Sequence, residues 1–282
     1  FLHRSRGLGD VYKRQTRTRA FIEQVAILHQ VGIRVVLVHG AGPQSTRRAT
    51  DLGLETRMVN GRRVTDAEMI RVSEAVAREL NEEIRGTCGE LDLPAVGLIG
   101  ADAGLVVAEK RAEVEVEGVG LVDYGYVGDI RTIDAGAIQT TLDAGQLPVI
   151  SSLSADSGGT ALNINADTVA AALAAELHAE KLILATGALG ILENVLDPAS
   201  LVSYLDLSGL TKMKAAGSLA DGMLPKAQAI EAAISGGVPR VHVISFAVPD
   251  SLLLEIFTNE GTGTLIVKSI EALTEAEQAT VQ

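Results

Sequence analysis

The chain has 282 residues, which is enough for one large α/β domain or two smaller ones. Its formal net charge of -12 argues against the basic face that nucleic-acid binding requires, so we expect no nucleic-acid partner. The single cysteine, Cys88, excludes an internal disulfide and a cysteine-based zinc site and is typical of a reducing compartment, so we expect a cytoplasmic protein. No apolar run reaches about 18 residues, and we therefore expect no membrane span.

The first residues differ from the rest of the chain. Residues 1–15 (FLHRSRGLGDVYKRQ) are basic and interrupted by glycine, and they have neither a helical nor a strand period nor the apolar centre of a signal peptide. They are similar to adapter-derived translation, so we expect residues 1–17 to be non-native or disordered. A fold built of βαβ units requires a strand before its first helix, and the sequence offers none at this place.

From residue 18 onward, segments with apolar residues at helical spacing alternate with short apolar runs that are typical of buried strands. The predicted helices cover residues 18–30, 43–52, 65–85, 134–144, 168–177, 207–216, 225–235 and 251–257. The predicted strands cover residues 33–39, 94–99, 105–108, 124–133, 147–151, 181–185, 241–245 and 263–268, with 105–108 and 124–133 antiparallel. The alternation predicts an α/β protein whose mainly parallel sheet is covered by helices on both faces. Without a linker in residues 18–282, we expect a single domain that ends in a short helix or frayed tail.

Polar residues gather where one predicted strand runs into a helix. Asn163, Asn165 and Asp167 alternate with apolar residues, as on a strand end or an extended turn. Open α/β sheets place ligands at such strand ends, and the start of a helix favours anions. The alternative is a plain helix cap, in which the Asp167 side chain accepts hydrogen bonds from the first turn.

Four further motifs adjoin a predicted helix or turn. Residues 39–43 (HGAGP) follow a strand and open a helix, where an anion is favoured, although a plain tight turn has the same pattern. Residues 60–65 (NGRRVT) offer two arginines, one of which could grip a carboxylate, or they form a solvated loop. Residues 222–226 (GMLPK) place Lys226 in a first helical turn, which is unfavourable unless an anion lies nearby; an exposed lysine is the alternative. Residues 186–190 (TGALG) could border a nucleotide or form a hairpin.

Taken together, these motifs resemble the amino acid kinase family and, within it, the acetylglutamate kinases. The resemblance covers about residues 18–268 and rests on VLVHGAGPQ, NGRRVTDAE, YGYVGDI, PVISSL, LNINAD, GMLPKAQAI and SLLLEIFTNEGTGTLIV. It implies a three-layer αβα sandwich with a mainly parallel central sheet. The implied activity is ATP-dependent phosphorylation of the side-chain carboxylate of N-acetyl-L-glutamate, the second step of arginine biosynthesis. The lobe of about residues 18–165 would bind the amino acid, and the lobe of about 166–282 the nucleotide.

The resemblance also implies the site residues. For catalysis it implies Lys226, which would stabilise the transferring phosphoryl group, and Asp167, which would orient the catalytic lysines. For the acceptor it implies contacts from Ala41, Gly42, Arg63 and Asn163. For ATP it implies contacts from Gly187, Gly190, Leu192, Ala220, Asp221 and Gly222. Mg²⁺ is expected on the ATP phosphates, with no metal site made of side chains. No general base is expected, because a carboxylate is already a nucleophile and phosphoryl transfer depends on positioning and positive charge.

The sequence departs from the family pattern at three places. The family has a strand with Lys-x-Gly-Gly before the first helix, and its absence here leaves the activity of this chain open. Position 41 is alanine in place of glycine, and Gly187 stands where the family has aspartate. Two alternatives remain: an arginine-binding regulatory domain like that of N-acetylglutamate synthase, and a kinase for carrier-linked aminoadipate. Arginine is a candidate feedback inhibitor, and the resemblance implies at least a homodimer.

Overall fold

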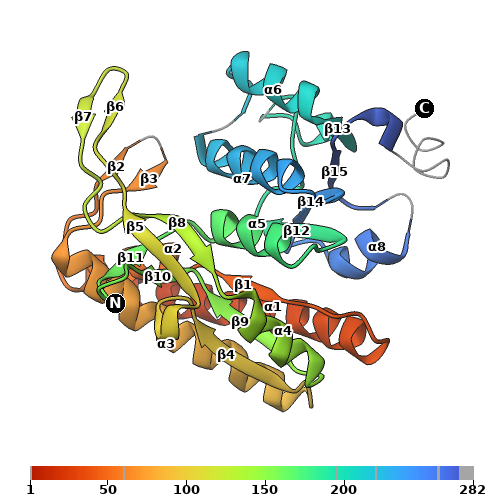
Figure 1. Cartoon of the computed structure of the whole chain (residues 1–282), viewed down its shortest axis with the longest axis horizontal. Coiled ribbons are helices and arrows are strands. Elements are labelled where there is room, and N and C mark those ends of the chain that lie inside the picture. Colours follow the sequence, from red (N-terminus) through yellow and green to blue (C-terminus); the bar gives the residue numbers. More distant parts are fainter. Residues whose placement is uncertain (1, 60, 195, 220, 259–260, 273–282) are drawn as a thin grey trace.

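Helices and strands alternate along the chain in the computed structural model (Figure 1), which describes residues 2–59, 61–194, 196–219, 221–258 and 261–272. The helices are α1 (Leu2–Gln30), α2 (Gly42–Asp51), α3 (Ala67–Glu90), α4 (Ala135–Asp143), α5 (Ala166–Glu176), α6 (Leu207–Ala215), α7 (Leu224–Ser235) and α8 (Ser251–Phe257). The first eight strands are β1 (Leu37–His39), β2 (Met58–Val59), β3 (Arg62–Arg63), β4 (Ala95–Ile99), β5 (Val106–Lys110), β6 (Val114–Val116), β7 (Gly120–Val122) and β8 (Gly128–Ile133). The remaining strands are β9 (Leu147–Ser151), β10 (Leu153–Ala155), β11 (Ala161–Asn163), β12 (Lys181–Thr186), β13 (Tyr204–Asp206), β14 (Arg240–Ser245) and β15 (Thr264–Val267).

Within the described residues, the strands form three sheets and two hairpins. The first sheet has the order β1-β9-β4 and is entirely parallel. The second has the order β12-β14-β15-β13, with β12 parallel to β14 and β14 antiparallel to β15. The third has the order β11-β10-β5-β8, and its antiparallel β5–β8 pair confirms the prediction for residues 105–108 and 124–133. The hairpins are β2–β3 and β6–β7.

One face of the first two sheets is covered by α1, α3 and α8. Leu80 of α3 and Leu252 of α8 share one buried apolar cluster with Val149 of β9 and Ile244 of β14. The same cluster therefore covers strands of both sheets. A backbone covered in this way must be apolar on the covered side, which explains the continuous apolar runs in these strands.

The opposite face is covered by α4, α5, α6 and α7, and α5 packs on both sheets. Val169 and Leu173 of α5 lie in the cluster that includes Ile150 of β9, whereas Ala171 and Ala174 lie in the cluster that includes strands β12 and β14. With helices on both faces, the structure confirms the predicted three-layer α/β fold.

Among the described residues, the central layer is divided into separate sheets. Strand β1 pairs with β9 alone and β12 with β14 alone among the described residues, so each ends its sheet with an unpaired edge. The first sheet also begins later than predicted, because residues 33–36 lie outside β1. The cause is the missing pairing, since an extended segment without a neighbour on one side makes fewer ladder hydrogen bonds.

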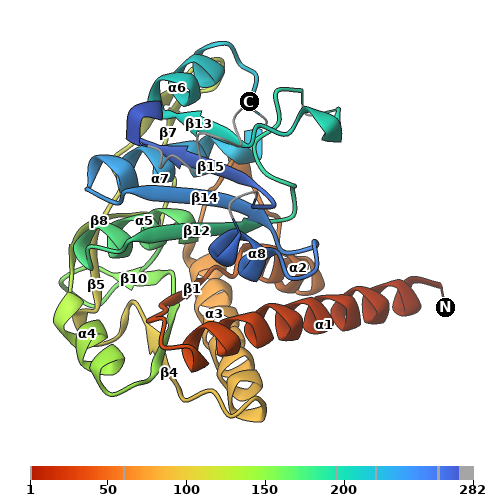
Figure 2. The same ribbon diagram turned by 90° about the vertical axis from the view of Figure 1, so that its right-hand side faces the viewer.

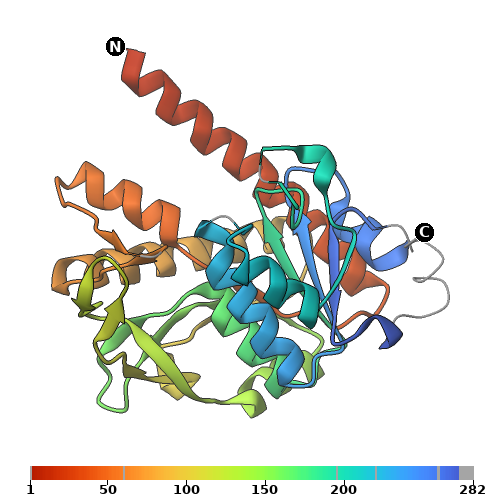
Figure 3. The ribbon, with the colours of Figure 1, turned by 90° about the horizontal axis from the view of Figure 1, so that it is seen from above.

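Helix α1 is longer than predicted. Helix α1 begins at Leu2, where we predicted a start near Thr18, and its first half projects away from the remaining helices (Figures 2 and 3). Its second half is anchored, because Ile22, Val25 and Leu28 are buried. An anchored turn removes the cost of nucleation, and the preceding residues contain no proline, so the helix can extend backwards. Whether residues 1–17 are native stays a prediction.

The tail from residue 269 is described only in part. A 3₁₀ turn covers Ile270–Ala272, and residues 273–282 lie outside the described part of the chain. Of the helices that are described, none is both long enough and apolar enough to cross a bilayer.

Candidate active site

The first turns of α5 and α7 bring together the two predicted catalytic residues. Lys226 Nζ lies 2.9 Å from Asp167 Oδ1, with the lysine side chain 9% exposed and the aspartate 26%. Both residues stand at helix starts, where unpaired backbone N–H groups create positive potential. Asp167 therefore stabilises Lys226 at a place where a buried cation would otherwise be unfavourable. The pair leaves a positive, donor-rich corner that suits a phosphate group.

The cap of α5 is Asn165, not Asp167. The Asn165 side chain accepts a hydrogen bond of 2.8 Å from the Asp167 N–H. The alternative prediction, in which Asp167 itself caps the helix, is therefore wrong. Because Asn165 satisfies this donor, the Asp167 carboxylate is free to pair with Lys226.

The four predicted acceptor-binding residues line one small cavity. Ala41, Gly42, Arg63 and Asn163 come from the loop before α2, from strand β3 and from the end of β11, and together they border a space of about 30 Å³. This cavity is small and partly open to solvent.

Arg63 lines this cavity and is bound to two residues beside it. Its Nη2 donates to the Gly42 carbonyl oxygen at 2.8 Å and to Thr46 Oγ1 at 2.6 Å. Burial lowers the pKa of the half-buried guanidinium, which nonetheless stays charged. Both acceptors are neutral, so no carboxylate compensates its charge through these bonds. The arrangement suits an anionic ligand.

Asn163 is held less firmly. Its Nδ2 donates to Thr65 Oγ1 at 3.4 Å, at the edge of hydrogen-bond distance. The Asn163 N–H also donates to Tyr126 O at 2.8 Å, which fixes its backbone. The side-chain amide therefore remains available to a ligand.

Sequence reasoning missed three serines that line the same cavity. Ser45, Ser73 and Ser152 are all buried there. The Ser45 hydroxyl has no hydrogen-bond partner, although buried hydroxyls are normally paired. Ser45 stands at the third position after Gly42, where a phosphate-binding loop would have glycine, and that departure was the available signal. For Ser73 the signal was a small polar residue on the apolar face of a long helix.

His39 ends β1 beside this loop and is neutral at physiological pH. Its Nε2 lies 3.0 Å from Asn81 Nδ2, which also donates to Val149 O at 2.9 Å. Burial lowers the pKa of His39 to about 4. The other ring nitrogen, Nδ1, is buried without a partner. These contacts favour the prediction of a strand-end histidine over a catalytic one.

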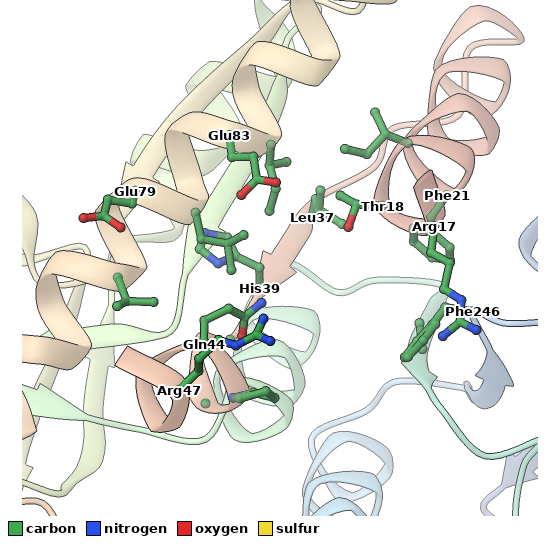
Figure 4. Close-up of a pocket in the computed structure, with 18 of the residues that line it drawn as sticks. Arg17, Thr18, Phe21, Leu37, His39, Gln44, Arg47, Glu79, Glu83 and Phe246 are labelled. Carbon is green, nitrogen blue, oxygen red and sulfur yellow. The ribbon is translucent and has the colours of Figure 1, made fainter. Parts of the chain in front are cut away.

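A second, much larger cavity separates β1 from β12. Its volume is about 1210 Å³, and Leu37 and His39 of β1 and Ala185 of β12 border it, together with Phe246 after β14. In Figure 4, Leu37 and His39 lie on one side of the space and Phe246 and Arg17 on the other. The cavity therefore lies between the two unpaired sheet edges.

The loop after β1 connects this cavity to the catalytic corner. Gly42 lines both cavities. A Cβ atom on Gly40 would lie 3.1 Å from the Cβ of Ala166, the first residue of α5. The close approach of the loop to α5 explains the need for glycine at position 40.

Two of the predicted nucleotide-binding residues face open space. Gly187 follows β12 and is exposed, and Gly222 is exposed with no atom within 4 Å of the position of a Cβ. Gly222 lies in the 3₁₀ turn Asp221–Met223, directly before the helix that carries Lys226. Both backbones are accessible to a ligand.

The other predicted nucleotide-binding residues are placed differently. Gly190 is buried, and a Cβ there would lie 2.7 Å from both Leu201 and Thr264, so packing alone explains this glycine. Leu192 forms a β-bridge with Leu201. Ala220 lies outside the described residues, and for Asp221 only the backbone is described. The nucleotide side of the site is thus less well defined than the acceptor side.

No metal cluster is built from side chains in the described part of the chain, where three or more histidines, cysteines or acidic residues nowhere gather closely enough to hold an ion. The donors present, namely helix N–H groups and Lys226, instead fit an anionic, phosphate-rich ligand. Such a ligand can carry its own Mg²⁺, which commonly binds through substrate phosphates.

Comparison with known proteins agrees with this geometry. Residues 9–245 match the amino acid kinase family. The chain belongs to the amino acid kinase family. An acetylglutamate kinase of Myxococcus xanthus is 45% identical over 256 residues, which cover 89% of this chain and 83% of the relative. An acetylglutamate kinase of Archaeoglobus fulgidus is 40% identical over 252 residues, covering 87% and 86%.

Solved structures show the same fold. N-acetylglutamate synthase of Neisseria gonorrhoeae, complexed with coenzyme A and L-arginine, is 29% identical with a TM-score of 0.78. The match covers 90% of this chain and 58% of the synthase chain. A carbamate kinase of Giardia lamblia bound to AMP-PNP is 17% identical with a TM-score of 0.58, covering 90% of both chains, and shows the fold alone.

Proposed function

We propose that this chain transfers a phosphoryl group from ATP to the side-chain carboxylate of N-acetyl-L-glutamate. The proposal rests on the ion pair between Lys226 and Asp167 at the starts of α7 and α5. Gly40, in the loop that closely approaches α5, connects this pair to the cavity that Arg63 borders. Lys226 and the guanidinium of Arg63 therefore lie on opposite sides of the loop after β1. The sequence similarity to acetylglutamate kinases supports the same activity.

Lys226 and the two helix starts would hold the transferring group. ATP, when bound, supplies the phosphoryl group, with Mg²⁺ on its phosphates. Lys226 would neutralise charge on the equatorial oxygens, and N–H groups at the start of α7 would donate to them. Asp167 keeps the lysine oriented through the 2.9 Å contact. The exposed backbones of Gly187 and Gly222 are the candidates for nucleotide contacts.

Arg63 would bind the acceptor. Its guanidinium can exchange the neutral acceptors on Gly42 and Thr46 for a carboxylate, which is the stronger partner. Asn163 would hydrogen-bond the acetylated amino end, and the backbone of Ala41 and Gly42 would donate N–H groups. The acceptor carboxylate would attack the γ-phosphorus of ATP while the bond from that phosphorus to the bridging oxygen breaks and ADP leaves. Since the carboxylate is already deprotonated, no residue needs to remove a proton.

The cavity between β1 and β12 offers a place for an added strand that carries Lys-x-Gly-Gly. A strand placed there could pair with both edges, and its carboxyl end would reach the level of His39 and the start of α5. A Lys-x-Gly-Gly motif at that end would add a second cation to the phosphate corner. Loss of one such charge-stabilising group lowers the rate about 10²- to 10³-fold.

The test is a hydroxamate assay for acyl phosphate with acetylglutamate, ATP and Mg²⁺. It compares this chain with a version whose first 15 residues are replaced by a strand carrying Lys-x-Gly-Gly. We expect the repaired version to form acyl phosphate and Lys226→Met in that version to lose it. If neither version turns over, yet arginine raises the melting temperature, the chain is instead an arginine-binding regulatory domain, the alternative suggested by the synthase structure.

A further inference from the structure

The β2–β3 hairpin carries two adjacent arginines with different partners. Arg63 contacts Gly42 and Thr46 of its own lobe, as described above. Arg62 Nη2 instead donates a 2.7 Å hydrogen bond to Gln228 Oε1 on α7. Adjacent residues of a strand point to opposite sides, which explains why the two guanidinium groups diverge. The Arg62 bond joins the acceptor-binding hairpin to the helix that carries Lys226.

The base of this hairpin is held by the backbone. Val64 N donates to Arg57 O at 2.9 Å, Thr65 N to Tyr124 O at 2.9 Å, and Tyr126 N to Thr65 O at 2.7 Å. The ladder itself has only two residue pairs. A two-stranded hairpin of this length is not stable alone. Val59 is buried in an apolar cluster with Val122, Tyr124 and Val127, and its carbonyl oxygen accepts from Tyr124 Oη at 3.4 Å, so the Arg62 bond is an additional restraint on the hairpin.

The charges around Arg62 direct it toward α7. Asp129, the acidic residue that attracts it, is already bound by Arg111, whose Nη2 lies 2.5 Å from Asp129 Oδ1. Burial and the nearby Arg111 lower the pKa of Arg62, which remains charged. Gln228 is exposed and supplies a neutral oxygen to this half-buried guanidinium.

We propose that Arg62 is a positioning residue whose hydrogen bond to Gln228 holds the β2–β3 hairpin against α7. This hydrogen bond is called the clasp below. The clasp sets the separation of Arg63, on the hairpin, from Lys226, two residues before Gln228. Arg63 lines the acceptor cavity, so the position of the hairpin sets the shape of the space in which the acceptor would bind. The clasp fixes that position. The effect of the clasp on turnover rests on the proposed function, whereas its effect on the position of the hairpin does not.

The structural part is tested without substrate by hydrogen exchange of the amides of residues 57–65. Arg62→Met and Gln228→Leu each remove one partner, and we expect each to speed exchange about tenfold, the value of one hydrogen bond to a charged group. The double variant should exchange no faster than either single one. The control is Arg34→Met, which breaks the bond from Arg34 Nη1 to Asp143 Oδ1 at the other end of β1 and should leave these amides unchanged. Unchanged exchange in either clasp variant overturns the proposal.

The kinetic part uses the hydroxamate assay on whichever version of the chain is active. Misplacing reacting groups lowers turnover more than binding, so we expect kcat to fall about tenfold in both single variants and the double one, with KM changed less than about threefold. If Arg62→Met slows the reaction and Gln228→Leu does not, Arg62 acts through its charge and the clasp is wrong. If exchange accelerates as expected but no version of the chain makes acyl phosphate, the clasp stands and the proposed function fails.

Discussion

Protonation of His39 should account for a large part of the acid sensitivity of this protein. Burial lowers the pKa of His39 to about 4, whereas the unfolded chain has the ordinary value near 6.5. The folded state thus favours the neutral ring. This contribution to stability is complete above pH 6.5 and is lost as the pH falls toward 4. Linkage of the two pKa values predicts a loss of about 2 kcal/mol between pH 7 and pH 5.

The substitution His39→Gln isolates this effect. A glutamine oxygen can accept from Asn81 Nδ2 as the ring nitrogen does, but it does not titrate. Urea unfolding of both proteins at several pH values should show a stability difference that changes by about 2 kcal/mol from pH 7 to pH 5. A constant difference for His39→Gln would refute the reasoning from burial.

Three further substitutions test the site and the fold. In an active version of the chain, Asp167→Asn should lower kcat by about 10²-fold with little change in the KM for ATP, because Lys226 loses the charge that orients it. Steady-state kinetics measure both constants, and an unchanged kcat would contradict the role assigned to Asp167. Arg63→Lys should raise the KM for acetylglutamate about 10- to 100-fold through loss of a charge-assisted, two-point contact, whereas a selective rise in the KM for ATP would place Arg63 on the wrong side of the site. Gly125→Ala should cost about 3 kcal/mol or more in urea unfolding, because Gly125 has φ of 71° and a Cβ there would lie 2.2 Å from Thr65 O; wild-type stability would show that this turn relaxes freely.

Local patterns in the sequence predict most helices and the longer strands of this fold. Leu162 and Ile164 are buried as their alternation with asparagines indicates, and Asp66 caps α3 through bonds from the N–H groups of Glu68 and Met69. The short strands of the β6–β7 hairpin were missed because three residues are too few to show a period. The pairing of strands is not local, so the division of the central sheet could not be inferred from the sequence.

The candidate site shows the same division between local and long-range information. The sequence indicated that a cation in the first turn of α7 needs an anion nearby. Spacing and propensity could not show that the anion is Asp167, which stands 59 residues earlier in the chain; only the resemblance implied this role. Spacing and propensity also could not choose between Asn165 and Asp167 as the cap of α5, because both residue types cap helices well. Only the path of the chain into α5 decides between them.

Helix α5 determines how the molecule unfolds. The two sheets that it covers share no strand pair among the described residues, and each could in principle melt at its own temperature. Yet Val169 and Leu173 are buried in one apolar cluster and Ala171 and Ala174 in the other, so melting either sheet exposes one side of the same helix. A helix of 11 residues that loses one of its packed sides is marginal in water. The loss of one sheet therefore removes part of the cover of the second, and we expect the two sheets to unfold together.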